Sequence, residues 1–291
     1  MAVLRACCWL CVAVMLISVP RLVAGRPVRA RSRVFQYNPN NTDLIEGDII
    51  PPKQSKQRFT TYAVVKDRAL TWPDGTVFYK YDPDSFPPGP EEEEESGFRL
   101  VIKQVSPKED SERYIIVQAM QLIQEKTCVK FEPHTDQKNF VTFAHRPGRC
   151  ASHVGMQGEE QVVALDLSYC PGLGQVAHEL LHVLGFFHEH SRPDRDEYVD
   201  VLWDNIKPDA NQSFWLKPET EADTLGEPYD YESVMHYPFD AFAVKEAEPT
   251  LLPKSVNVKR ETLGKAYAEG FLTDTDITQI NVLYTCGKQP S

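Results

Sequence analysis

Three histidines with a fixed spacing form the part of the chain whose chemistry is easiest to recognise. His178 and His182 are four residues apart, so in a helix they lie on one face, one turn apart. Their imidazoles can then bind the same metal ion at about 2.0–2.1 Å, the usual zinc–nitrogen distance. Gly185 can take a positive φ, which ends the helix and lets the chain bring His188 to the ion as a third ligand. The pattern predicts a metal site with three neutral histidine ligands.

Glu179 indicates what such a site can do. A zinc ion with three protein ligands keeps an open position for water and lowers the pKa of that water to about 7. Glu179 directly follows His178, and we expect it to take the proton of this water as a general base and pass it to the leaving amine of a peptide. Two histidines at this spacing can also be an ordinary core or surface pair. The glycine and the third histidine at the required offsets favour the catalytic interpretation.

The segments around this motif have to hold it in place. Apolar residues recur at helical spacing within residues 113–126, namely Ile115, Ala119, Leu122 and Ile123, and the motif itself begins as a helix near Gln175. Runs rich in β-branched and aromatic residues predict short strands at residues 76–81, 129–131, 140–144 and 162–167. Between the first strand and the first helix, residues 82–112 carry Pro83, Pro87, Pro88 and Pro90, which are followed by five consecutive glutamates. We interpret this stretch as a solvated acidic insertion, with a partner-binding acidic segment as the alternative.

The composition is that of a globular protein, because 42% of the 291 residues are apolar and 25% are charged. The formal net charge is −11, and it is unevenly distributed. Residues 1–62 hold 9 of the 31 Lys and Arg residues but 3 of the 42 Asp and Glu residues, so the rest of the chain is strongly acidic. Such a charge repels phosphate backbones and anionic lipids, which disfavours a nucleic-acid-binding or membrane-surface protein.

The start of the chain predicts its compartment. Arg5 precedes an apolar run at residues 6–19, and small residues follow at 23–25. The run is shorter than the roughly 20 residues that a membrane-spanning helix needs, so we interpret residues 1–25 as a signal peptide, with an N-terminal core helix as the alternative. No other stretch is apolar enough to span a membrane. The protein is therefore expected to be secreted to the extracellular space.

Cysteine use agrees with secretion. After the predicted leader is removed, the remaining cysteines are Cys128, Cys150, Cys170 and Cys286. An even number in an oxidising compartment predicts two disulfides, and the spacing leaves all three pairings open. A metal site made of thiols is disfavoured because no two of these cysteines form a Cys-x-x-Cys pair. Sequons at Asn40 and Asn211 permit N-glycosylation.

Residues 26–62 differ in composition from the rest of the chain. They are rich in Arg, Pro, Asn and Gln and contain few apolar residues, so they cannot form a core of their own. We interpret them as a prosegment that becomes ordered by lying on the remaining domain, residues 63–291.

The stretch from His178 to Glu189 resembles the zinc-binding motif of the astacin family of metzincin zinc endopeptidases, His-Glu-x-x-His-x-x-Gly-x-x-His-Glu. Residues 191–199 are similar to the stretch that follows the third ligand in that family, and residues 228–237 are similar to its Met-turn. The resemblance extends from Trp72 to Cys286 and is closest to ovastacin-like and hatching-enzyme-like members of the family.

The resemblance implies an α+β fold, namely a two-lobed metzincin catalytic domain with an N-terminal mixed sheet, a long active-site helix and a cleft between the lobes. It implies one Zn²⁺ per chain, with Met235 as an apolar floor beneath the metal. It further implies that Tyr237 is an additional zinc ligand that can also donate a hydrogen bond to the developing oxyanion. Of the three possible disulfide pairings, it selects Cys128–Cys286 and Cys150–Cys170.

The same resemblance implies how the precursor is kept inactive. Residues 44–48 resemble the latency motif Phe-x-Gly-Asp, with Ile45 where the family often has Phe, so Asp48 is expected to replace the catalytic water on zinc. The mature chain is expected to begin near Ala63, with a tryptic site at residues 66–68 as the alternative. Glu189 is then expected to contact the new α-amino group, directly or through water.

These observations predict a secreted zinc-dependent endopeptidase that is made as a latent zymogen. Its expected partners are protein or peptide substrates and an activating protease, and neither nucleic acid nor a membrane span is expected. A secreted zinc-stabilised binding protein without catalysis is the alternative. Retention of Glu179 and Tyr237 beside the three histidines favours the enzyme.

Overall fold

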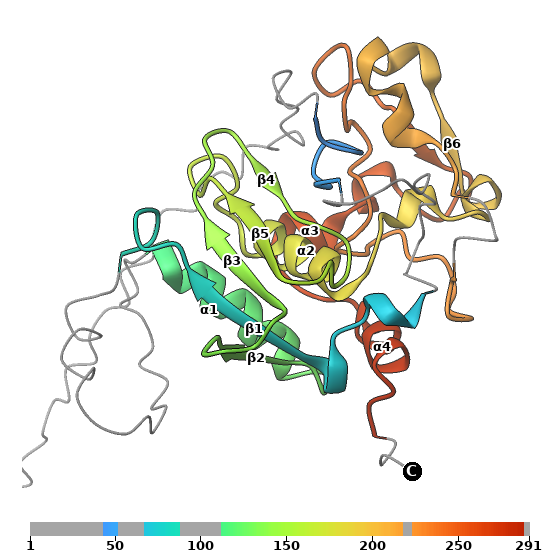
Figure 1. Ribbon diagram of the computed structural model, residues 1–291. Coiled ribbons are helices and arrows are strands. Elements are labelled where there is room, and N and C mark those ends of the chain that lie inside the picture. Colours follow the sequence, from blue (N-terminus) through green and yellow to red (C-terminus); the bar gives the residue numbers. More distant parts are fainter. Residues whose placement is uncertain (1–42, 52–66, 88–111, 218–222, 288–291) are drawn as a thin grey trace, which may run out of the picture. The chain divides into compact units, whose positions relative to one another are not determined.

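The computed structural model describes residues 43–51, 67–87, 112–217 and 223–287 (Figure 1). The predicted signal peptide, most of the predicted prosegment, Asn40 and the glutamate run of the acidic insertion lie outside the described residues. The proposed domain boundaries at residues 25 and 62 lie outside them as well, and they stay predictions.

A mixed five-stranded sheet forms the first half of the described chain. Its spatial order is β2-β1-β3-β5-β4, with all neighbours parallel except β4, which is antiparallel to β5. The strand bounds are β1 Thr76–Tyr81, β2 Lys130–Pro133, β3 Phe140–Ala144, β4 Cys150–Ala151 and β5 Glu160–Leu165. Alternate side chains such as Val77, Val141 and Val163 are completely buried, as expected for strands packed on a helical layer. The predicted α+β class with a mixed sheet is confirmed.

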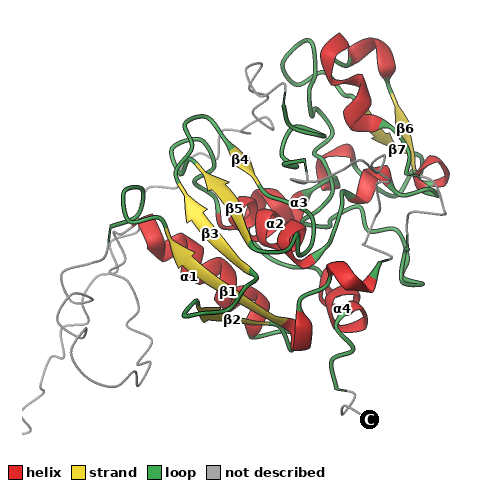
Figure 2. Cartoon of the chain, in the orientation of Figure 1, coloured by secondary structure: helices red, strands yellow, loops and turns green. Residues whose placement is uncertain are grey.

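Two helices, α1 Glu112–Gln124 and α2 Leu173–Leu184, lie on one side of this sheet and contact each other (Figure 2). The predicted apolar face of α1 is shifted by one residue, because Ile116 and Met120 are buried whereas Ile115 and Leu122 are partly buried. The face is therefore centred on Ile116, Ala119, Met120 and Ile123, which still follow the helical repeat.

Helix α2 is buried along almost its whole length, and two glycines explain how it fits. Gly174 lies so close to helix α3, Lys265–Glu269, that a Cβ atom there would be 2.2 Å from the carbonyl oxygen of Tyr267. Gly185 ends α2 with φ 106°, and its amide donates to the carbonyls of Leu181 and His182. The predicted turn out of the active-site helix at Gly185 is thus present.

The second half of the described chain has little regular structure. It contains the helix α4 Asp274–Leu283 and the antiparallel pair β6 Val199–Val201 and β7 Leu251–Pro253. Turns and loops make up most of the rest. The 3-10 segments of the described chain are Arg68–Leu70, Pro73–Gly75, Glu189–Ser191, Arg195–Glu197, Trp203–Asn205, Pro208–Phe214 and Arg260–Thr262. The sequence did not predict β4, β6 or β7, which are only two or three residues long.

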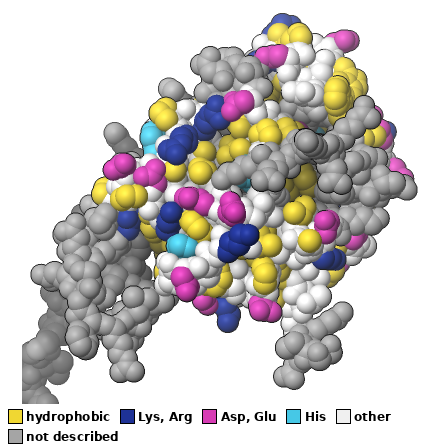
Figure 3. Space-filling model, viewed as in Figure 1, with side chains coloured by type: hydrophobic (Ala, Val, Ile, Leu, Met, Phe, Trp, Pro, Cys, Tyr) yellow, Lys and Arg dark blue, Asp and Glu magenta, His cyan; other side chains and the backbone are white. Residues whose placement is uncertain are grey.

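The described residues form two hydrophobic cores. The larger core joins the sheet to α1, α2 and α4. The smaller core gathers residues from 199 to 263, including Val199, Ile206, Phe214, Phe242 and Leu251. Tyr267 packs against both cores. Figure 3 shows acidic and basic side chains interspersed over the visible face.

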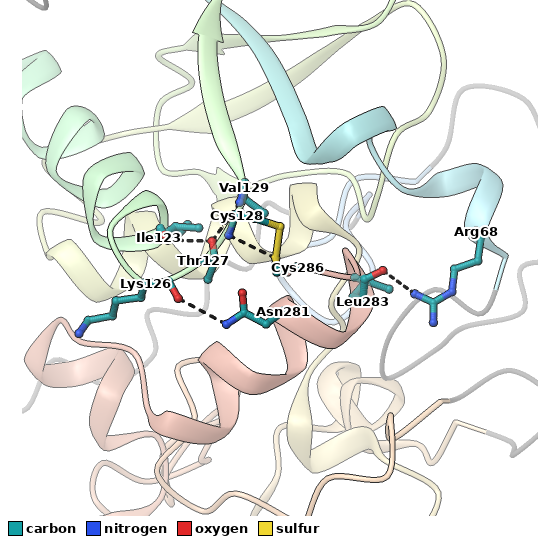
Figure 4. The surroundings of a disulfide bond; sticks show 9 residues. All are labelled: Arg68, Ile123, Lys126, Thr127, Cys128, Val129, Asn281, Leu283 and Cys286. Carbon is teal, nitrogen blue, oxygen red and sulfur yellow. Dashed lines mark hydrogen bonds between the residues drawn. A yellow bond between two sulfur atoms is a disulfide. The ribbon is translucent and has the colours of Figure 1, made fainter. Parts of the chain in front are cut away.

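Two disulfides tie distant segments together. Cys128, just before β2, is bonded to Cys286, just after α4, and the amide of Cys128 lies 3.2 Å from the Sγ of Cys286 (Figure 4). Beside this bond, Asn281 donates to the carbonyl of Lys126 at 3.4 Å. The second disulfide joins Cys150 in β4 to Cys170 in the loop before α2. These are the two pairs that the family resemblance implies. Among the described residues, no helix has the length and apolar character needed to cross a bilayer.

Candidate metal centre

The three histidines of the sequence motif meet at one buried point. His178 and His182 project from the same face of α2 with ring centroids 4.6 Å apart, and His188 reaches them after the turn at Gly185. The Nε2 atoms of His178 and His188 are 3.3 Å apart. With one carboxylate oxygen of Asp48, the ligand atoms of the three histidines all lie within 4.8 Å of one another. All four side chains are buried.

Hydrogen bonds on the far side of each ring orient the histidines toward this point. The Nδ1 atom of His178 donates to the carbonyl of Val234 at 2.8 Å, and that of His182 donates to the carbonyl of Phe186 at 2.7 Å. The Nδ1 atom of His188 lies 2.6 Å from a carboxylate oxygen of Glu46. Because these oxygens accept, each Nδ1 carries the hydrogen and each Nε2 lone pair is directed to the common centre.

The donor set fits a zinc ion. Within the described part of the chain, His182 Nε2, Asp48 Oδ1 and Glu179 Oε2 are buried polar atoms without a hydrogen-bond partner. Buried polar atoms without a partner are costly, and a cation among the imidazoles would satisfy those that face it. Three imidazole nitrogens and one carboxylate oxygen make a four-coordinate set that is typical of zinc. This is the three-histidine zinc site that the sequence predicts.

Asp48 and Glu179 are both buried and have opposite pKa shifts. Burial acts to raise the pKa of Asp48, but the effect of the three imidazoles beside it outweighs burial, so the pKa lies below its usual value. Burial raises the pKa of Glu179 well above its usual value, and the negative charge of Asp48 adds to this effect.

Asp48 is held in place by backbone pairing and by apolar anchors. Ile45 and Ile49 exchange two backbone hydrogen bonds of 2.8 and 2.9 Å across a tight turn. On the sheet side, the amide of Ser152 donates to the carbonyl of Asp48 at 3.0 Å, and the carbonyl of Ser152 accepts from the amide of Ile50 at 2.8 Å. The segment therefore runs parallel to the chain at the end of the edge strand β4. Leu44 and Ile49 are buried, whereas Ile45 is partly buried. The two most deeply buried apolar residues of this segment, Leu44 and Ile49, thus lie on either side of Ile45, the position where the family often has Phe.

The Met-turn residues lie beside the three histidines. Met235 is buried in the larger core, and its carbonyl accepts from the amide of Glu189 at 2.9 Å. The ring of Tyr237 is fully buried, with its centroid 4.6 Å from that of His188 and 3.8 Å from that of His190, on which it stacks. The hydroxyl of Tyr237 donates to the backbone carbonyl of Glu46. The phenol is therefore engaged with the segment 43–51, which belongs to the predicted prosegment.

Glu189 is buried and engaged in a polar network. Its Oε1 atom accepts from Arg192 and from the amide of Asp230, each at 2.9 Å. Burial raises the pKa of Glu189 to about 7, although the positive charge of Arg192 opposes the shift. The residues at which the mature chain would begin lie outside the described residues, so the contact with a new α-amino group stays a prediction. Asn211, in the second sequon, lies in the 3-10 segment Pro208–Phe214 with a partly buried side chain.

Sequence reasoning missed two charged residues at this centre. Glu46 lies inside the latency motif, but the motif treats its position as variable. Its carboxylate contacts both His188 and the ammonium group of Lys217, which is itself buried. Lys217 is 171 residues away from Glu46 in the chain, and no local pattern marks it.

The chain is similar to known peptidases over more than half of its length. Residues 99–285 match the peptidase family described as Astacin. The zinc metalloproteinase nas-14 of Caenorhabditis elegans is 42% identical over 181 residues, which cover 62% of this chain and 35% of that protein. Bone morphogenetic protein 1 of Xenopus laevis is 39% identical over 178 residues, which cover 60% of this chain and 25% of that protein. The chain thus spans about a third or less of the length of these two relatives.

A hatching-enzyme relative matches over much more of its length. The low choriolytic enzyme of Oryzias latipes is 33% identical over 257 residues, which cover 88% of this chain and 83% of that protein. Among solved structures, the high choriolytic enzyme 1 of the same fish, a hatching enzyme zinc-protease, superposes with a TM-score of 0.58 at 27% identity. That match covers 81% of this chain and all of the solved chain.

Proposed function

Because the chain belongs to the astacin family of zinc metallopeptidases, we propose that it is a zinc-dependent endopeptidase that is made as a latent precursor and secreted. The observation that carries the proposal is the convergence of three histidine Nε2 atoms on the carboxylate of a residue from the prosegment. Two disulfides and the predicted leader favour an extracellular location.

Each residue at the centre has a role in the proposed hydrolysis. His178, His182 and His188 hold the ion, which when bound acts as a Lewis acid toward a peptide carbonyl and makes water more acidic. The carboxylate of Glu179 takes a proton from the attacking water and delivers it to the amine nitrogen as the carbon–nitrogen bond breaks. The hydroxyl of Tyr237, once released from Glu46, donates a hydrogen bond to the carbonyl oxygen as that oxygen gains negative charge.

The prosegment blocks this reaction at two levels in the proposed latent form. Asp48 would occupy the coordination position that a water molecule needs on a bound ion. The backbone around Asp48 also pairs with Ser152 at the sheet edge, where an extended substrate would add as a strand. Activity therefore requires an activating protease to remove the segment.

The test compares Glu179→Gln with a matched control, Glu132→Gln, which changes an exposed glutamate in β2. The secreted precursor is assayed against denatured protein before and after limited proteolysis, with and without a zinc chelator. We expect trimmed wild-type and Glu132→Gln proteins to cleave and the chelator to abolish cleavage. Glu179→Gln should keep one zinc per chain and lose about 10²–10⁴-fold in rate, the usual contribution of a general base. If trimmed, zinc-loaded wild type cleaves nothing, the protein is a zinc-stabilised binding protein instead.

A further inference from the structure

The three zinc ligands differ in what orients them. His178 and His182 donate to backbone carbonyls of the catalytic domain itself, at Val234 and Phe186. His188 is bonded instead to the side-chain carboxylate of Glu46, which belongs to the segment that activation removes. A carboxylate behind a ligand histidine fixes the ring and makes it a stronger ligand. The outer shell of the site is thus shared between the domain and its prosegment.

Glu46 is buried beside the three histidines. Its side chain is 1% exposed, and its second carboxylate oxygen contacts the ammonium of Lys217, a residue that is 5% exposed. Its backbone carbonyl accepts from the hydroxyl of Tyr237. A buried carboxylate is strongly unfavourable without a cation beside it, and the Lys217 ammonium supplies that cation for Glu46. An uncharged side chain in place of Glu46 would not compensate the charge of Lys217.

From these contacts we propose that Glu46 and Lys217 form a second latch of the latent enzyme, in which Glu46 is a positioning residue for His188. The inference rests on the proposed latency through Asp48, and it adds two statements. Glu46 raises the zinc affinity of the precursor by orienting the third ligand, and Lys217 holds the segment in place through the charge of Glu46. Release of the prosegment then removes a zinc-binding carboxylate and the carboxylate behind His188 in one step.

Another ion pair of the same segment provides an internal contrast. Asp43 accepts two hydrogen bonds from Arg149, at 2.7 and 2.9 Å, but the Asp43 side chain is 61% exposed. Ion pairs exposed to solvent contribute little because water and salt screen them. Asp43→Asn is therefore a matched control that removes a carboxylate contact from the same segment without changing the metal centre.

The experiment measures the zinc affinity of the full precursor by competition with a chromogenic chelator, together with the peptidase activity of the uncleaved precursor. We expect Glu46→Leu to lower zinc affinity by about 10–100-fold, the usual effect of losing such a partner, and to raise the activity before cleavage. Lys217→Met should raise that activity as well, whereas Lys217→Arg should stay close to wild type. Asp43→Asn should change neither quantity by more than about threefold.

A double variant and the trimmed proteins serve as controls. If Glu46→Leu fails to fold because Lys217 is left buried, the double variant Glu46→Leu/Lys217→Met replaces the pair with apolar groups and should still show the loss of zinc affinity. After trimming, Glu46→Leu and wild type are the same chain, so their mature forms must behave identically. Wild-type zinc affinity and latency in the folded double variant would overturn the proposal. A lack of peptidase activity in trimmed wild type would instead contradict the proposed function, and the zinc titration would still test the latch.

Discussion

The two halves of the described chain are stabilised in different ways. In the first half, a regular sheet and two helices bury apolar side chains in the larger core. In the second half, loops and short 3-10 turns surround the smaller core, and buried charged groups connect them. Periodic elements satisfy their own backbone groups, whereas irregular segments depend on side chains from elsewhere to do so.

Arg192 is the centre of the polar network in the second half. Its guanidinium donates to the carboxylates of Glu189 and Asp194 and to the backbone carbonyls of Glu227 and Pro228. The side chain is 2% exposed. One buried cation thus joins the turn after the third zinc ligand to the segment that leads into the Met-turn.

The largest effect is expected when this cation is removed. Arg192→Met should lower the free energy of unfolding by about 4 kcal/mol, because the Glu189 carboxylate stays buried without its charged partner. Zinc affinity should also fall, since Glu189 directly follows His188. Urea unfolding of the zinc-loaded precursor and a chelator titration measure the two quantities. Arg192→Lys keeps the charge but loses the forked geometry, so it should lie between wild type and Arg192→Met.

A cavity in the apolar half should have a smaller and more local effect. Ile116 in α1 is fully buried, and Ile116→Ala should lower the free energy of unfolding by about 3 kcal/mol. Zinc affinity should change by less than about threefold, because the hydrogen bonds that orient the histidines of α2 run to the carbonyls of Val234 and Phe186 and do not involve Ile116. Val256→Ala is the control, since Val256 is 98% exposed. A loss of zinc affinity in Ile116→Ala as large as in Arg192→Met would refute the comparison.

The same contrast decides how much could be predicted from the sequence. The ligand spacing at His178 and His182 follows the helical repeat, and Gly185 marks the end of that helix, so local rules suffice for the zinc site. Helix α1 and strands β1 and β3 are long enough to show a period. Strands β6 and β7 have three residues each, which is too short for any period to appear.

Contacts between distant charged residues had no signal in the sequence. Glu46 and Lys217 meet 171 residues apart, and each would be expected on the surface when its own neighbourhood is considered alone. The position of Asp48 was predicted through the family resemblance and not through any local rule. The active-site helix could thus be derived from residue types and spacing, whereas the polar groups around it required the fold.

Acid should act on the second half through Asp276. This buried carboxylate accepts from the hydroxyl of Ser233 at 2.6 Å and from the amide of Val234 at 3.1 Å, and so connects α4 to the Met-turn. Burial raises its pKa to about 6, against the effect of the Ser233 hydrogen bond. Because the folded state holds the proton more tightly than the unfolded state, this group stabilises the fold most below about pH 4 and loses that contribution as the pH rises through about 6.

The size of this contribution is at most about 3 kcal/mol, the free energy that corresponds to raising the pKa of a carboxyl group from its usual value to about 6. Thermal unfolding of wild type and Asp276→Asn between pH 4 and pH 6, with a chelator in both samples, isolates it from zinc release. The stability of wild type relative to the variant should fall across this range. A difference that is constant with pH would mean that Asp276 is already ionised at pH 4.

The smallest effect is expected for a charge pair of the second half that water reaches. Lys265 and Glu232 are 3.4 Å apart, and each side chain is 41% exposed. A double-mutant cycle with Lys265→Gln and Glu232→Gln should give a coupling below about 1 kcal/mol that disappears at high salt. A coupling similar to the effect of Arg192→Met would mean that charge alone stabilises this half. A weak coupling means that burial gives Arg192 its importance, because only there does loss of a partner leave a charge that water cannot solvate.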